Sequence, residues 1–141
     1  MQFEQQVEIA TPAETVFSLY ADVGTWAAWD PEVKESSIEG RFASGVTGAL
    51  RPLKGPKTQI FFTEVTENRS FTVESRLPLC VMRFDHELSE SPGRAVTRVT
   101  HRVSFIGLLS PFFGRLIGGQ IRRGLPGTML GLKRAAEERY P

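Results

Sequence analysis

The chain has 141 residues, of which 40% are hydrophobic and 23% charged, and its formal net charge is +1. This length and balance are typical of one globular domain over residues 1–141 with a core of its own, and they exclude a disordered chain. Because there is no basic excess to neutralise phosphates, nucleic acid is not an expected partner.

Cysteine content and the N-terminus indicate the compartment. Cys80 is the single cysteine, so no internal disulfide can form, and no cysteine–histidine cluster has zinc-site spacing. The first six residues lack the basic start and apolar run of a signal peptide. No apolar stretch approaches the roughly 18 residues of a spanning helix. We therefore expect a cytoplasmic protein with no integral membrane segment, no metal and no cofactor.

The N-terminal third predicts one strand and one or two short helices. Polar and apolar residues alternate over 2–9, which is typical of a strand. Thr11, Pro12 and Glu14 then have the residue types of an N-cap, N1 and N3, so they predict a capping box and a short helix to about Asp22. The segment that follows leaves room for a second short helix.

The rest of the chain predicts a sheet and a long helix. Turn signals recur about every ten residues and indicate antiparallel strands near 33–40, 46–52, 57–66, 70–77, 80–90 and 94–106. Ser110-Pro111 then opens a long helix with an apolar stripe, which Pro126 is expected to kink or break in two. The only element long enough to cover the sheet is this helix. The fold class is therefore α+β, a curved antiparallel sheet of about seven strands around the C-terminal helix.

Several local runs carry a family resemblance over essentially the whole chain. They are VEIATPAETVF at 7–17, Asp22-Val23, Trp26, Trp29-Asp30-Pro31, Val65-Thr66-Glu67, Phe71-Thr72-Val73 and Leu132-Lys133. With the element order, they resemble the START-like (SRPBCC) superfamily, which has the helix-grip or Bet v 1-like fold. More narrowly, the chain is similar to the polyketide cyclase/dehydrase and lipid-transport family. The resemblance implies that fold, and it leaves function open between ligand carriers, aromatase/cyclases and stress-response regulators.

Strand alternation predicts which side chains face the interior. Apolar residues occupy one face of 71–77, 80–88 and 97–105, and an apolar concavity of this kind is how small-molecule sites usually look. The expected ligand-binding residues are Trp26, Trp29, Phe61, Phe71, Val73, Met82, Phe84, Val99, Val103, Leu116, Gln120 and Met129.

Both histidines of the protein fall on these inward faces. A hairpin around Ser91-Pro92-Gly93 would pair residues whose numbers sum to about 183 or 185. In the second of these registers Phe84 lies opposite His101, with His86 diagonal to it at about 7–8 Å. His86 and His101 are then candidate catalytic residues, an acid–base pair for enolisation or aldol cyclisation. Alternatively, each ring packs with one nitrogen bonded to Thr97 or to a backbone group. The two histidines and Cys80 offer no convincing third ligand for a metal.

Four other features are open to two interpretations. Trp26 and Trp29 either close one end of the core or stack on a planar ligand. Residues 60–62 are apolar on both strand faces, which indicates a homodimer contact or a covering helix. Glycines in the last helix either leave volume for a ligand or permit close packing or face solvent. Its arginines form a solvated face or touch a membrane.

Three hypotheses for function follow. The leading one is binding or transport of a hydrophobic small molecule of lipid, polyketide or isoprenoid type. The second is an enzyme of the cyclase/dehydratase type that uses His86 and His101. The third is a partner-binding module that uses the face around Ile60 and Phe62.

Overall fold

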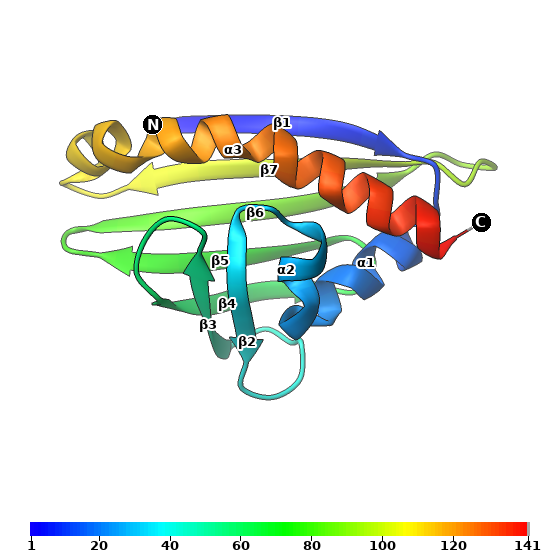
Figure 1. Ribbon diagram of the computed structural model, residues 1–141, viewed down its shortest axis with the longest axis horizontal. Coiled ribbons are helices and arrows are strands. Elements are labelled where there is room, and N and C mark those ends of the chain that lie inside the picture. The colour runs from blue at the N-terminus through cyan, green and yellow to red at the C-terminus, as the bar shows by residue number, and fades with distance from the viewer. Residues whose placement is uncertain (141) are drawn as a thin grey trace.

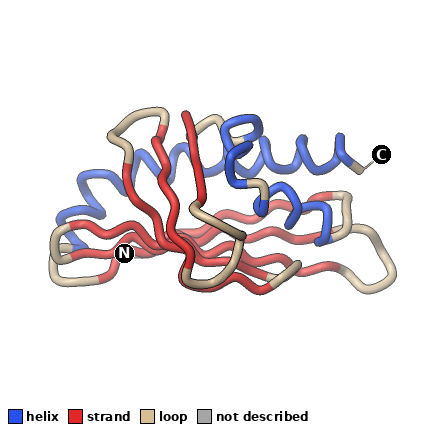
Figure 2. Tube along the Cα trace, turned by 90° about the horizontal axis from the view of Figure 1, so that it is seen from below, coloured by secondary structure: helices blue, strands red, loops and turns tan. Residues whose placement is uncertain are grey.

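A seven-stranded antiparallel sheet and a long C-terminal helix make up most of the protein, whose computed structural model describes residues 1–140. The strand order is β1-β7-β6-β5-β4-β3-β2, so the first strand pairs with the last (Figure 1). The helices lie on one side of the sheet (Figure 2). The elements are β1 (Gln2–Ile9), α1 (Ala13–Ala21), the 3-10 turn η1 (Val23–Thr25), α2 (Trp26–Trp29), β2 (Val33–Ile38), β3 (Val46–Pro52), β4 (Thr58–Thr66), β5 (Ser70–Leu77), β6 (Cys80–Glu90), β7 (Thr97–Ile106) and α3 (Ser110–Arg139).

The sheet is strongly curved. In Figure 1, β2 and β3 run steeply across the direction of β6 and β7, and α3 lies over the concave side. The expected α+β helix-grip architecture is therefore confirmed, including the short helices after the first strand.

The start of α1 differs from the expected capping box. Pro12 is the last non-helical residue, with φ −65° and ψ 156°, and no side chain of the first turn caps the helix. The Ala13 N–H instead donates to the Glu90 carboxylate at 2.6 Å. A carboxylate near a helix N-terminus is favourable wherever it comes from in the chain. Here it comes from the far end of β6, so Glu14 is not needed for this role.

Of the two outcomes expected for Pro126, a kink or a break of the last helix, the break is wrong. Residues 110–139 form one continuous helix with Pro126 inside it. Proline removes one amide hydrogen bond and crowds the preceding turn. Pro126 lies on the exposed side of α3, where water can replace the lost donor, so the helix continues.

The β6–β7 register also differs from both registers expected for this hairpin. His86, and not Phe84, lies opposite His101. The connection is wider than a tight hairpin, because Ser91 N–H bonds to the Val96 carbonyl at 2.9 Å and β7 begins only at Thr97. The two histidines are therefore direct cross-strand neighbours.

A bulge in β4 corrects the interpretation of residues 60–62. The pairing with β5 shifts between Phe62 and Glu64, so strict alternation fails along this strand. Ile60 and Phe62 point inward and are 3% and 0% exposed. Phe61 lies on the opposite, outer face, where the Arg76 guanidinium sits 4.2 Å from its ring centroid. The face proposed for a partner or homodimer contact is thus part of the core.

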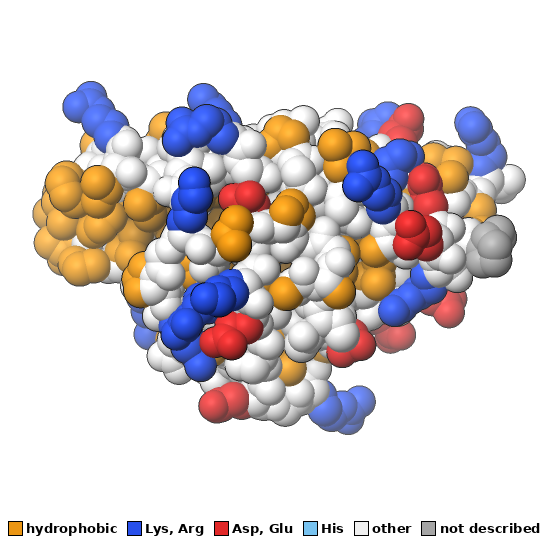
Figure 3. All heavy atoms as spheres, in the orientation of Figure 1, with side chains coloured by type: hydrophobic (Ala, Val, Ile, Leu, Met, Phe, Trp, Pro, Cys, Tyr) orange, Lys and Arg blue, Asp and Glu red, His pale blue; other side chains and the backbone are white. Residues whose placement is uncertain are grey.

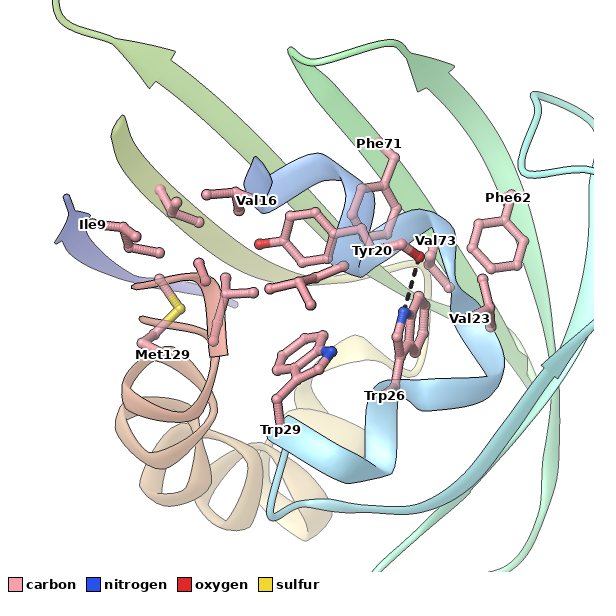
Figure 4. Packing of buried hydrophobic residues seen from close by; sticks show 14 of the residues in the cluster. Ile9, Val16, Tyr20, Val23, Trp26, Trp29, Phe62, Phe71, Val73 and Met129 are labelled. Atoms are coloured by element: carbon pink, nitrogen blue, oxygen red, sulfur yellow. Dashed lines mark hydrogen bonds between the residues drawn. The ribbon is translucent and has the colours of Figure 1, made fainter. Parts of the chain in front are cut away.

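The core has two parts along α3. One is an aromatic cluster around Tyr20, Trp26, Trp29, Phe62 and Phe71, joined by the C-terminal half of α3 (Figure 4). The other is a smaller cluster near the start of α3, which includes Phe3, Cys80, Val103, Phe105 and Leu125.

Candidate functional site

A cavity of about 480 Å³ lies between the concave face of the sheet and α3. Strands β5 and β6 supply its floor, because every second residue of each strand points to the concave face. Most of its wall is apolar. The main apolar residues are Trp26, Trp29, Val33, Leu50, Ile60, Phe71, Val73, Leu77, Met82, Phe84, Val103, Phe113, Leu116, Ile117, Ile121 and Leu125.

The cavity is elongated along the strands. Its lining runs along β5 from Phe71 to Leu77, and along α3 from Phe113 to Thr128. The six steps of strand from Phe71 to Leu77 correspond to about 20 Å. One end, which we call the deep end, contains Tyr20, His86 and His101. The other, the open end, contains exposed residues of α3 and of the β3–β4 loop, such as Leu116 and Lys54.

The two histidines meet at the deep end. Their ring centroids are 4.5 Å apart and the planes are inclined at 75°. The His86 ring stacks on Phe71 at 3.9 Å and 4°. His86 Nδ1 lies 3.1 Å from the Phe71 carbonyl oxygen, which can only accept, so Nδ1 carries the hydrogen. In neutral His86, Nε2 therefore keeps its lone pair.

Tyr20 completes this polar group. Its hydroxyl is 2.6 Å from His101 Nε2, and a phenol can donate or accept in such a bond. Its side chain is fully enclosed, with Phe71 4.7 Å away between ring centroids. Burial, with a smaller effect of Asp30, holds the pKa of Tyr20 well above its usual value, so the phenol stays protonated.

Burial also keeps both histidines neutral. It lowers the pKa of His86 to about 4, against the opposing effect of the Phe71 and Phe84 carbonyls. The pKa of His101 is lowered well below its ordinary value by burial and by the neighbouring His86. At neutral pH the deep end is thus a group of uncharged hydrogen-bonding side chains.

A second polar group lies on the cavity wall at α2 and α3. Asp30 Oδ1 accepts hydrogen bonds from the Thr128 hydroxyl at 2.7 Å and from the Glu32 amide at 2.9 Å. Burial raises the pKa of Asp30, although these two bonds act in the opposite direction. Asp30, Glu32 and Thr128 all line the cavity.

The two tryptophans differ in their hydrogen bonding. Trp26 Nε1 donates to the Tyr20 carbonyl at 3.0 Å, which ties α2 to the end of α1 (Figure 4). Trp29 Nε1 is buried and has no hydrogen-bond partner within residues 1–140. Both side chains line the cavity and are also packed in the aromatic cluster. The packing of both side chains in the core is confirmed, and their stacking on a planar ligand stays a prediction.

Most of the expected ligand-binding residues lie on the cavity wall, together with the two histidines. Those that line it are Trp26, Trp29, Phe71, Val73, Met82, Phe84, Val103, Leu116 and Gln120. Val99 and Met129 are buried in the aromatic cluster and are not part of the wall. Phe61 is on the outer face because the β4 bulge offsets the alternation.

Sequence reasoning missed Tyr20, Asp30 and Ile60 as wall residues. In the sequence, Tyr20 lies among apolar residues at helical spacing in the first predicted helix. A signal was available, since a buried tyrosine hydroxyl usually needs a partner and the two inward histidines were candidates. Ile60 could not be placed without the bulge.

The glycines of α3 mainly permit close packing. A Cβ at Gly124 would meet the Glu32 side chain, and one at Gly131 would meet the Trp29 carbonyl. Gly114 and Gly118 face the Met1 side chain. The glycines thus bring α3 against Met1 and the α2–β2 segment, as the close-packing interpretation requires.

Within residues 1–140, no three His, Cys, Asp or Glu side chains gather in a way that could hold a metal ion. Among the helices of the same residues, none has the length and apolar character needed to cross a membrane.

The comparisons with known proteins agree with this architecture. Residues 1–137 match the family described as polyketide cyclase / dehydrase and lipid transport. The chain belongs to this family. No curated protein sequence matches the chain.

Solved structures with the same fold include enzymes and a START protein. The Zhui aromatase/cyclase from Streptomyces sp. R1128 has a TM-score of 0.78 at 15% identity, with 100% of this chain and 96% of that chain covered. Norcoclaurine synthase from Thalictrum flavum has 0.74 at 13%, covering 100% and 88%. A START superfamily protein from Mycobacterium smegmatis has 0.72 at 19%, covering 97% of each chain. At these identities the likeness shows the fold alone.

Proposed function

We propose that the protein binds an elongated, neutral, hydrophobic small molecule in the cavity between the sheet and α3. The observation that carries this proposal is the cavity of about 480 Å³ with a mainly apolar wall and one group of uncharged polar side chains at its deep end. Apolar burial supplies affinity, and a few convergent polar groups orient the ligand.

The charges on the wall favour a neutral ligand. Two wall residues, Asp30 and Glu32, are acidic. The basic residue Lys54 is exposed at the open end, away from the two histidines. A ligand carboxylate at the deep end would meet two neutral histidines and no cation. A ligand hydroxyl could instead donate a hydrogen bond to the lone pair of His86 Nε2. Molecules of lipid, polyketide or isoprenoid type with one hydroxyl or enol group fit this description.

A fluorescent probe tests cavity binding. N-phenyl-1-naphthylamine is neutral and apolar, and its fluorescence should rise with saturation when it is titrated with the protein. Val73→Phe puts bulk into the cavity, whereas Val81→Phe puts the same bulk on the outer face of the same sheet. We expect Val73→Phe to weaken binding about tenfold or more, with little change for Val81→Phe. No saturable signal, or equal effects of both variants, would contradict the proposal.

A pair of ligands tests the polar end. 1-Naphthol should bind about threefold to tenfold more tightly than 1-methylnaphthalene, because only the naphthol can donate a hydrogen bond to His86. The preference should disappear in His86→Phe. An equal preference in that variant would exclude His86 as the acceptor.

Acid–base catalysis is a second candidate, which the direct pairing of His86 with His101 favours. The lowered pKa of His86, about 4, makes it a weak base at neutral pH, and this is why binding is the first proposal. Deuterium exchange at the methyl group of 2-acetylnaphthalene in D₂O, followed by NMR, tests for enolisation. Exchange above the buffer rate that is lost in His86→Gln would support an enzyme. Exchange at the buffer rate would remove this candidate.

A further inference from the structure

Large hydrophobic side chains are exposed together at the end of the molecule where α3 begins (Figure 3). We call this set the terminal apolar patch. Its members and their exposed fractions are Leu79 (65%), Ile106 (43%), Leu108 (79%), Phe112 (57%) and Leu116 (64%). Exposed apolar groups that cluster in this way mark an interaction site more often than scattered ones do.

The patch is continuous and held on ordered backbone. Leu79, Ile106 and Leu108 line one shallow groove. The Leu109 amide donates to the Leu79 carbonyl at 3.0 Å, which ties the β5–β6 turn to the start of α3. Phe112 and Leu116 are one helical turn apart on α3. The patch is therefore a preformed surface built from two connections and a helix.

The charged residues around the patch are mainly basic, although the Glu32 carboxylate lies beside Gly124 of α3 on the cavity wall. No acidic residue occurs between Glu90 and Glu137, nor between Glu39 and Glu64. The first stretch contains the exposed Arg115, Arg122 and Arg123, and the second contains the exposed Lys54 and Lys57. None of these five side chains forms an ion pair within the described residues. Because the net charge of the chain is only +1, this is a local basic region.

The open end of the cavity is beside this surface. Exposed residues that line the cavity come from α3 and the facing β3–β4 loop, namely Leu116, Gln120, Lys54, Gly55 and Pro56. Leu116 belongs to both the patch and the cavity wall. A surface that covered the patch would therefore also face the cavity opening.

We propose that the terminal apolar patch docks on an anionic membrane surface, with Arg115, Arg123, Lys54 and Lys57 facing the lipid headgroups. Apolar side chains that enter the headgroup boundary and basic residues around them are the two contributions that hold a peripheral protein on such a membrane. A second copy of this chain fits less well. A two-fold interface would place the same patch on both subunits and would bring the two sets of arginines together.

Vesicle sedimentation tests the proposal. The intact protein should bind vesicles of mixed phosphatidylglycerol and phosphatidylcholine much more tightly than vesicles of phosphatidylcholine alone. This binding should be lost at high salt. Arg115→Glu/Arg123→Glu should reduce the partition coefficient about tenfold or more, since each basic residue near the surface contributes about 1 kcal/mol. Leu108→Ser/Phe112→Ser should reduce it to a similar degree.

Matched variants use exposed residues at a distance from the patch. Arg94→Glu/Arg134→Glu controls for charge, and Leu130→Ser/Tyr140→Ser controls for lost apolar surface. Both should bind vesicles as the unmodified protein does. Thermal unfolding and N-phenyl-1-naphthylamine binding should be unchanged in all four variants, which separates membrane docking from the cavity-binding proposal.

Two results would overturn the proposal. One is vesicle binding that is the same with and without the anionic lipid, or the same in the patch variants and their controls. The other is a dimer in light scattering that Leu108→Ser/Phe112→Ser converts to a monomer, because the patch would then be covered by a second copy.

Discussion

The two halves of α3 have different neighbours and different roles. In the first half, up to Gly124, the buried residues are Gly114 and Gly118, while Phe112 and Leu116 are largely exposed. In the second half, Leu125, Thr128, Met129, Leu132 and Ala136 are buried. The second half anchors the helix in the aromatic cluster, and the first half covers the open end of the cavity. One continuous helix thus combines a stabilising segment with a segment that leaves space for a ligand.

The largest expected effect comes from truncating the anchored half. Leu132→Ala removes a side chain that is 0% exposed and should lower the free energy of unfolding by about 2–5 kcal/mol. Leu116→Ala, at a residue that is 64% exposed, should cost less than about 1 kcal/mol. Denaturant unfolding of both variants measures the difference. Equal losses would mean that the two halves contribute alike to stability.

The deep end should also make stability depend on pH. The pKa of His86 is about 4 in the folded protein, below its ordinary value near 6.5, so the unfolded chain binds the proton more tightly. This contribution is fully present above pH 6.5 and is lost as the pH falls toward 4, by about 3 kcal/mol in total. Denaturant midpoints between pH 7 and 4 measure it. His86→Gln should show a shallower decline, and an unchanged slope would argue against a buried neutral His86.

Gly131 tests the close packing of the anchored half. A Cβ at this position would collide with the Trp29 carbonyl oxygen, and backbone atoms cannot move aside cheaply. Gly131→Ala should therefore lower the free energy of unfolding by about 1–3 kcal/mol, despite the better helix propensity of alanine. Gly127→Ala is the matched control, because its Cβ would make only an ordinary contact with Pro31. Two equally stable variants would contradict the packing argument.

The smallest expected effect is a gain in stability from a substitution in the first half of α3. A Cβ at Gly119 would meet only the flexible end of Arg123, so alanine fits there. Gly119→Ala should raise the free energy of unfolding by about 0.5–1 kcal/mol through the reduced freedom of the unfolded backbone. Thermal unfolding of Gly119→Ala and Gly131→Ala should show the melting temperature raised in the first variant and lowered in the second. A loss of stability would show that the first half of α3 is packed as tightly as the second half.

Much of the fold could be predicted from local patterns. Alternation along 71–77, 80–88 and 97–105 assigned inward faces that the structure confirms for Phe71, Phe84 and Val103. The presence of both histidines on the concave face followed from the same rule. The period of two is a property of a single strand, so it can be read without knowing the partner strand.

Features that depend on two distant segments could not be predicted. The pairing of His86 with His101 depends on how the 91–96 connection closes. The bond from Tyr20 to His101 joins residues 81 positions apart. The hydrogen bond from Ala13 to Glu90 replaces a local cap with a remote one. Each needs coordinates for both partners, and loop chemistry alone allowed more than one register.

By itself, the sequence determined the order of elements, the apolar inner face and the family, because these depend on local periodicity and on short motifs. Tertiary structure decided where the cavity opens, which residues make its polar end, and which half of α3 is buried. The apolar stripe of α3 is nearly continuous in the sequence, yet only its second half contains fully buried large side chains. In the first half, Phe113, Ile117 and Ile121 are only partly buried against the smaller cluster. The reason is geometric, since the curved sheet closes on the helix near the aromatic cluster and leaves space near its start.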